Sequence, residues 1–292
     1  MTTIGTVFLP GLPPEQLRRV AEAAEAAGLE ELWLWEDCFR EAGVSAAAAA
    51  LAWTSRLRVG VGLLPVPLRN VALTAMEAAT LERLFPGRLR LGIGHGVLDW
   101  MGQVGARVES PMTLLQEHAE ALRDLLAGER VTRQGRYVRL DGVALDWPPS
   151  APPELLVGGI GKRTLALAGR VSEGALLVFG LTPAAVAAAT GHVATGRAES
   201  GRPGAPRVVA SLLTATGPGA AERIRGELAR WEIAPSDDVA VAGDAEQVAA
   251  RVRRLADAGA TTVVLQPTVD DPDPREFARF AAQEVQPLVG AG

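Results

Sequence analysis

The chain has 292 residues, of which 48% are hydrophobic, and this length suits one (β/α)₈ barrel better than a small domain. Its net charge of −5 and the lack of a basic stripe argue against a nucleic-acid partner. It has one cysteine, no signal-peptide pattern and no apolar run that could span a bilayer, so we expect a cytoplasmic protein without membrane contact.

Strand-like and helix-like segments alternate along almost the whole chain. The expected strands are 4–9, 31–35, 57–64, 88–94, 154–158, 175–179, 207–215 and 261–266. The expected helices are 14–27, 44–54, 71–84, 111–126, 163–171, 183–198, 220–231, 245–258 and 274–288. The strands are nearly continuous apolar runs, as in parallel sheets buried on both faces. We therefore predict a single α/β domain over residues 1–292, a (β/α)₈ TIM barrel, with a hairpin at 131–146 inserted after the fourth helix.

A glycine-rich turn leads into a helix at residues 157–164, which read Val-Gly-Gly-Ile-Gly-Lys-Arg-Thr. Free N–H groups at a helix start, together with Lys162 (the only lysine) and Arg163, form an anion site. Glycines allow the backbone to approach a ligand closely. The alternative is an ordinary turn with a surface Lys-Arg pair. The functional interpretation is favoured because barrel active sites lie at the C-terminal ends of strands.

Several segments resemble the bacterial luciferase-like flavin oxidoreductases. They include Arg56-Leu-Arg-Val-Gly-Val-Gly-Leu-Leu-Pro65 and Gly87-Arg-Leu-Arg-Leu-Gly-Ile-Gly94, with the helix at 75–84 between them. The blocks 153–174 and 243–259 resemble the cofactor loop after the fifth strand and the last helix before strand eight. The resemblance covers nearly the whole chain and is unspecific for substrate.

The resemblance implies a homodimer that binds coenzyme F420, or alternatively FMN, with the ring in the barrel mouth. The cofactor would supply the hydride chemistry, and the protein would hold and tune the ring. A non-prolyl cis peptide is expected at residues 61–62. The expected cofactor-binding residues are Phe8, Gly62, Leu64, Gly94, Gly158, Gly159, Gly161, Lys162, Arg163 and Phe179.

The proton donor usual in the deazaflavin branch is missing. There the second strand often ends in an Asp-His pair, whereas this chain reads Trp33-Leu-Trp-Glu-Asp-Cys-Phe39. Glu36 or Asp37, acting alone, is a plausible substitute, because apolar neighbours raise the pKa of a carboxyl group. His95, which follows the fourth strand, is the alternative acid, although a lone histidine is equally often structural.

Asp99 and Trp100 follow in the same loop and are candidates for substrate contact, with Gln103, Arg107 and Glu109 beyond them. Trp100 as ordinary loop packing is the alternative. The three histidines of the chain are scattered, so we expect no metal site.

Three functions remain open from the sequence. The first is hydride transfer between coenzyme F420 and an organic substrate. The second is an FMN-dependent luciferase-like monooxygenase. The third, which the missing histidine supports, is a protein that binds flavin or deazaflavin without turnover.

Overall fold

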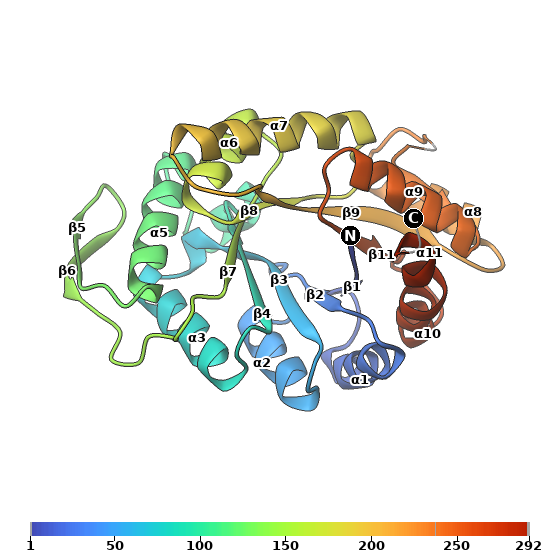
Figure 1. Ribbon diagram of the computed structural model, residues 1–292, viewed down its shortest axis with the longest axis horizontal. Coiled ribbons are helices and arrows are strands. Elements are labelled where there is room, and N and C mark those ends of the chain that lie inside the picture. The colour runs from blue at the N-terminus through green and yellow to red at the C-terminus, as the bar shows by residue number, and fades with distance from the viewer. Residues whose placement is uncertain (1, 237, 291–292) are drawn as a thin grey trace.

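The computed structural model describes residues 2–236 and 238–290, and its centre is a closed parallel barrel (Figure 1). Eight strands form the ring in the order β9-β11-β1-β2-β3-β4-β7-β8, and pairing of β8 with β9 closes it. The strands are β1 (Thr3–Phe8), β2 (Glu31–Leu34), β3 (Arg58–Pro65), β4 (Leu89–Gly94), β7 (Glu154–Gly158), β8 (Gly174–Leu177), β9 (Arg207–Ala215) and β11 (Thr262–Gln266). The predicted (β/α)₈ barrel is confirmed.

Helices surround the barrel and pack their apolar faces on the outward side chains of the strands (Figure 1). They are α1 (Leu17–Ala27), α2 (Gly43–Trp53), α3 (Val71–Leu84), α5 (Pro111–Leu126), α6 (Lys162–Val171), α7 (Pro183–Glu199), α8 (Ala220–Arg230), α9 (Ala245–Asp257), α10 (Pro274–Arg279) and α11 (Gln286–Gly290). Several begin at a residue that caps free N–H groups: Asn70 accepts from Ala72, and Asp244 with Gln247 forms a capping box. No helix within the described residues has the length and apolar character that crossing a bilayer requires.

Short elements account for most differences from the predicted pattern. The inserted hairpin is confirmed as β5 (Val131–Gln134) paired with β6 (Arg139–Val143). The helix α4 (Leu98–Gln103) and the strand β10 (Ala240–Ala242), which pairs with β9, were not predicted. The last predicted helix is interrupted, because a π-helical segment, Phe280–Val285, separates α10 from α11.

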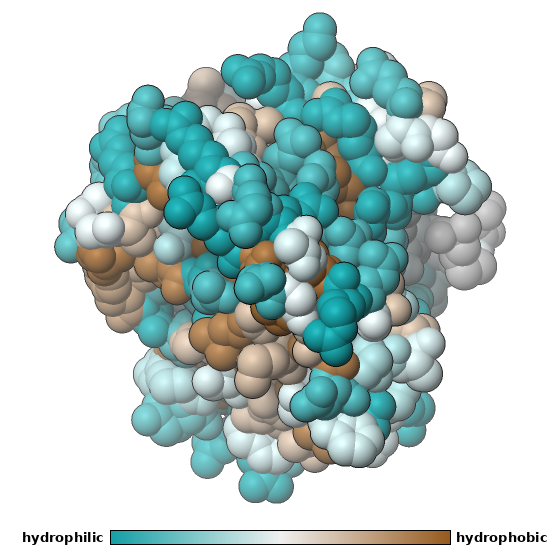
Figure 2. Space-filling view, turned by 90° about the vertical axis from the view of Figure 1, so that its left-hand side faces the viewer, coloured by the Kyte–Doolittle hydropathy of each residue, from teal (hydrophilic) through white to brown (hydrophobic). Residues whose placement is uncertain are grey.

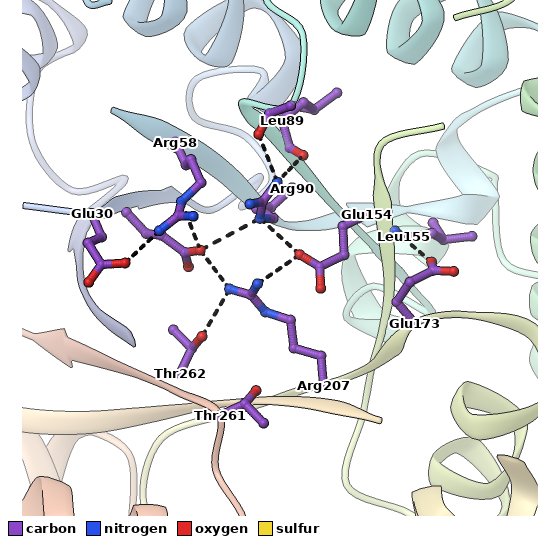
Figure 3. A network of polar contacts seen from close by, with 12 residues as sticks. Glu30, Arg58, Leu89, Arg90, Glu154, Leu155, Glu173, Arg207, Thr261 and Thr262 are labelled. Carbon is purple, nitrogen blue, oxygen red and sulfur yellow. Dashed lines mark hydrogen bonds and ion pairs between the residues drawn. The ribbon is translucent and has the colours of Figure 1, made fainter. Parts of the chain in front are cut away.

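Charged side chains fill the end of the barrel where the strands begin (Figure 3). Glu31 is fully buried there, and its carboxylate lies 2.6 Å from Arg207 Nη2, 3.6 Å from Arg90 and 3.7 Å from Arg58. Glu154 lies 2.9 Å from Arg90 and 2.8 Å from Arg207. Burial raises the pKa of Glu154 and lowers that of Arg90, and the opposite charges counter both shifts.

The indole of Trp33 sits above this charge network inside the barrel. Its Nε1 donates to Glu31 Oε2 (3.2 Å), and the ring fills space that Gly5 and Gly60 leave open. A Cβ on Gly60 would lie 2.4 Å from the ring, so glycine is required beside this indole. The network and Trp33 together close the barrel at one end.

Removing Glu31 should be costly. In Glu31→Ala, three arginines lose a shared buried partner, and we expect the free energy of unfolding in urea to fall by about 3–5 kcal/mol. Glu30→Gln is the matched control, since Glu30 pairs with Arg58 at the edge of this network and 39% of its side chain is exposed. This substitution should lower the free energy of unfolding by less than about 1 kcal/mol. Equal losses in the two variants would contradict a structural role for the buried network.

Candidate active site

The open end of the barrel carries the predicted anion site at the start of α6. The first helical hydrogen bond runs from Leu165 N to Gly161 O (3.0 Å), so the N–H groups of Lys162, Arg163 and Thr164 precede the helical ladder. Gly161 supplies no side-chain cap, and the Lys162 and Arg163 side chains are exposed. A phosphate at this turn would therefore meet free donors, a helix dipole and two cations.

One predicted donor of this site is already engaged. The N–H of Gly159 donates to Leu176 O (3.2 Å) across to β8, so in this conformation it is not free to bind a phosphate. A Cβ on Gly159 would lie 2.6 Å from the Thr164 side chain, and this packing accounts for the glycine there.

Strand alternation places Gly62, Gly94 and Gly158 on the inner face of the barrel near its mouth. Two of them are covered, because a Cβ on Gly94 or Gly158 would lie 2.6 or 2.2 Å from the Leu63 side chain. Leu63 was not predicted as a site residue, yet it forms this wall of the mouth. The non-prolyl cis peptide predicted at residues 61–62 lies one bond further on, at Gly62–Leu63, and a second is at Cys38–Phe39.

Two predicted cofactor contacts face away from the mouth. Phe8 and Leu64 are buried in the layer between strands and helices. For Leu64 the cause is a β-bulge, since Val61 pairs with Leu91 and Leu64 with Ile93, which shifts the alternation by one residue. Phe179 packs edge-on against Trp231, with ring centroids 5.3 Å apart. The cofactor-binding assignment of Phe8 and Leu64 is therefore corrected, and that of Phe179 stays a prediction.

Glu36 is committed to a structural ion pair. Its Oε2 accepts from Arg69 Nη2 (2.6 Å) and from Gly43 N (2.7 Å), and 8% of its side chain is exposed. Ala42, the residue before α2, offers no side-chain cap, and the Glu36 carboxylate takes the place of a cap by accepting from the first N–H of the helix. Arg69 was missed by sequence analysis because the contact joins residues 33 positions apart.

Asp37 is half-buried in the same loop and has no such partner among the described residues. Burial raises the pKa of its carboxyl group, and the nearby charge of Arg40 only partly opposes this. A carboxyl group of this kind holds its proton to higher pH than usual and can act as a general acid. Glu36 is thus ion-paired, and the role of Asp37 as the acid stays a prediction.

His95 links the loop after β4 to the neighbouring helices. Its Nε2 lies 3.3 Å from Thr164 Oγ1, and Thr164 Oγ1 also donates to Met112 Sδ (3.3 Å). Its Nδ1 is buried and makes no well-formed hydrogen bond to a described residue, although the Pro111 backbone is near. Burial lowers the pKa of His95, so the neutral ring is favoured and a proton-donor role is disfavoured.

The predicted substrate residues lie on α4, over the loop that follows β4. Asp99 is exposed and Trp100 is half-buried. Beyond them, Gln103 and Arg107 are exposed, and Glu109 is paired with Arg136 of the hairpin. Among the described residues, no three His, Cys, Asp or Glu side chains are grouped so as to hold a metal ion.

Comparison with known proteins gives one family. The model of the luciferase-like monooxygenases matches residues 4–235. A 5,10-methylenetetrahydromethanopterin reductase of Methanolobus tindarius is 30% identical over 201 residues, which cover 68% of this chain and 61% of that protein. An F420-dependent glucose-6-phosphate dehydrogenase of Nakamurella multipartita is 29% identical over 185 residues, covering 58% and 54%. The chain thus spans less than two thirds of either relative.

A solved structure with the same fold is an F420-dependent secondary alcohol dehydrogenase in complex with an F420-acetone adduct. Its TM-score is 0.88 at 21% identity, and the match covers 99% of each chain. At this identity the likeness shows the shared barrel.

His118, buried on α5, should make the fold sensitive to acid. Burial, with a smaller contribution from the charge of Arg69, lowers the pKa of His118 from 6.5 to about 4. As the pH falls, His118 is protonated in the unfolded chain before it is protonated in the folded protein. The contribution of neutral His118 to the free energy of unfolding is therefore fully present above pH 6.5 and is lost between pH 6.5 and 4. In His118→Gln, the free energy of unfolding should fall by about 3 kcal/mol less over this pH range than in the wild type, as measured by urea unfolding. An unchanged pH dependence would contradict this assignment.

Proposed function

Because the chain belongs to the luciferase-like monooxygenase family, we propose that it is an oxidoreductase that transfers hydride between coenzyme F420 and an organic substrate. The observation that carries the proposal is the uncapped start of α6 with its exposed Lys162 and Arg163, near an inward layer of glycines. Relatives that use F420 support the choice of cofactor over FMN.

Each part of the mouth has a separate task in this proposal. Lys162, Arg163 and the first N–H groups of α6 hold the phosphate-bearing tail. Leu63 and Leu176 line the wall against which the ring would lie, and they exclude water from it. When bound, the cofactor supplies the two-electron hydride chemistry. Asp37 gives a proton to the substrate oxygen on reduction and takes one on oxidation.

The resemblance also implies a cytoplasmic homodimer, which we include in the proposal. On the side of the molecule that bears α3 and α5, apolar residues form patches among polar ones (Figure 2). Leu73, Met76 and Leu84 of α3 are exposed and favour self-association. The molar mass in solution decides between monomer and dimer.

Lys162→Ala should weaken cofactor binding. A lost charge-assisted contact to phosphate corresponds to about 1–3 kcal/mol, which fluorescence titration of F420 measures as a higher Kd. Arg170→Ala, at the other end of α6 and paired there with Glu199, is the matched control and should bind normally. Titration of FMN into the wild type tests the alternative cofactor. Unchanged affinity of Lys162→Ala for both cofactors would reduce the lysine to a surface residue.

Asp37→Asn should bind F420 normally and lose turnover by about 10²–10⁴-fold, because its shape is kept while the titratable proton is removed. Turnover is followed by the absorbance of F420 with a ketone acceptor found by screening. His95→Gln is the comparison and should retain most of the activity. The reverse order, with a large loss only in His95→Gln, would show that the imidazole is the acid. Binding of F420 without turnover under any condition would favour a non-catalytic carrier.

A further inference from the structure

Large apolar side chains are exposed on the loops that surround the open end of the barrel. They follow β2, β3, β4, β7 and β8, and each is between 38% and 64% exposed. We call them the apolar rim: Phe39, Leu68, Val97, Leu98, Val104, Ile160 and Val178. Because all these strands are parallel, their following loops meet at one face of the molecule.

Exposed apolar residues are ordinary when they are scattered singly over a surface. The apolar rim is different, because its members come from five separate connections that meet at one face of the molecule. Water next to such a surface is released when an apolar molecule covers it, and this favours binding.

The apolar surface continues from the rim into the barrel. Trp35 and Leu176 are half-buried and pack on the inner cluster that contains Leu9, Trp33 and Val264. Leu63 covers the inward glycines between this cluster and the rim. A bound molecule would therefore meet apolar side chains from the opening to the floor of the mouth.

The charged groups on the β2 side of the mouth lie near groups of opposite charge. Glu36 is paired with Arg69, and Arg40 Nη1 donates to Pro10 O (2.9 Å). Burial raises the pKa of both Asp37 and Glu41, and the nearby charge of Arg40 opposes both shifts. Lys162 and Arg163 hold the cofactor tail in the proposed function. The exposed cation of the β2 side, Arg40, thus already has two carboxyl groups near it, so this side does not favour a further anionic group on the substrate.

We propose that the substrate is a neutral, largely apolar organic molecule whose body lies on the apolar rim while its reacting carbon faces the mouth. This inference deepens the proposed function and rests on the same site. It predicts that affinity follows the apolar length of a ligand rather than its charge.

A homologous series tests this directly. The probes are 2-alkanones from 2-butanone to 2-decanone, bound to F420-loaded protein and measured by displacement of Nile red fluorescence. Each added methylene should lower Kd about three- to fourfold until the rim is covered. Octanoate, an anion of similar length to 2-nonanone, should bind at least tenfold more weakly. A Kd that does not change with chain length, or equal binding of octanoate, would overturn the proposal.

Two rim variants locate the effect. Leu98→Asn and Val178→Asn replace exposed side chains, so the fold should persist while the dependence on chain length becomes shallower. Trp147→Ser is the matched control, because Trp147 is 72% exposed and lies in the connection that enters β7 from the closed end. An undiminished dependence in both rim variants would overturn the proposal. A molar mass that differs from that of the wild type in either rim variant would also overturn the proposal, because it would show that the apolar rim is an interface between copies of the chain.

The F420 titration keeps the two proposals distinguishable. If F420 fails to bind while the ligand-free protein still shows the expected series, the cofactor assignment is wrong and the rim assignment stands. If F420 binds and turns over with polar acceptors while the series is flat, the rim assignment is wrong and the oxidoreductase stands.

Discussion

A buried charge network at the closed end of the barrel is the constraint on which the site depends (Figure 3). Taking Glu31, Arg58, Arg90, Glu154 and Arg207 out of water is costly, and only their mutual pairing offsets that cost. Each belongs to the start of a different strand, so the pairing also fixes how the strands meet. Through its bond to Trp33, Glu31 holds the indole that fills the barrel above the network.

With that end filled by charges and an indole, a ligand can enter only at the other end. There the inward positions are small or apolar, namely Gly62, Gly94, Gly158, Leu63 and Leu176. The polar groups come instead from loops: the start of α6, Asp37 after β2 and His95 after β4. This arrangement allows a flat ring to lie in the mouth, a phosphate to bind at α6 and one carboxyl group to lie beside the substrate.

Strand and helix periodicity was enough to predict the barrel, because eight long βα units have few other ways to bury their apolar faces. The glycine turn before Lys162 was also readable, since its chemistry is local. The direction in which side chains point at the strand ends could not be predicted. The bulge in β3 places Leu63 instead of Leu64 at the mouth, and Phe8 lies on the outer face of β1 by alternation. The ion pair of Glu36 with Arg69 could not be predicted either, because it depends on the folded arrangement of two loops.

The crystal structure of the protein with F420 bound tests the central claim most directly. The account predicts the phosphate at the first N–H groups of α6 beside Lys162, with the ring against Leu63 and within reach of Asp37. The chain offers a rival position, a hollow between the starts of α8 and α9 lined by Gly217, Gly219 and Gly243. A phosphate found there, or a ring that lies away from Asp37, would contradict the account.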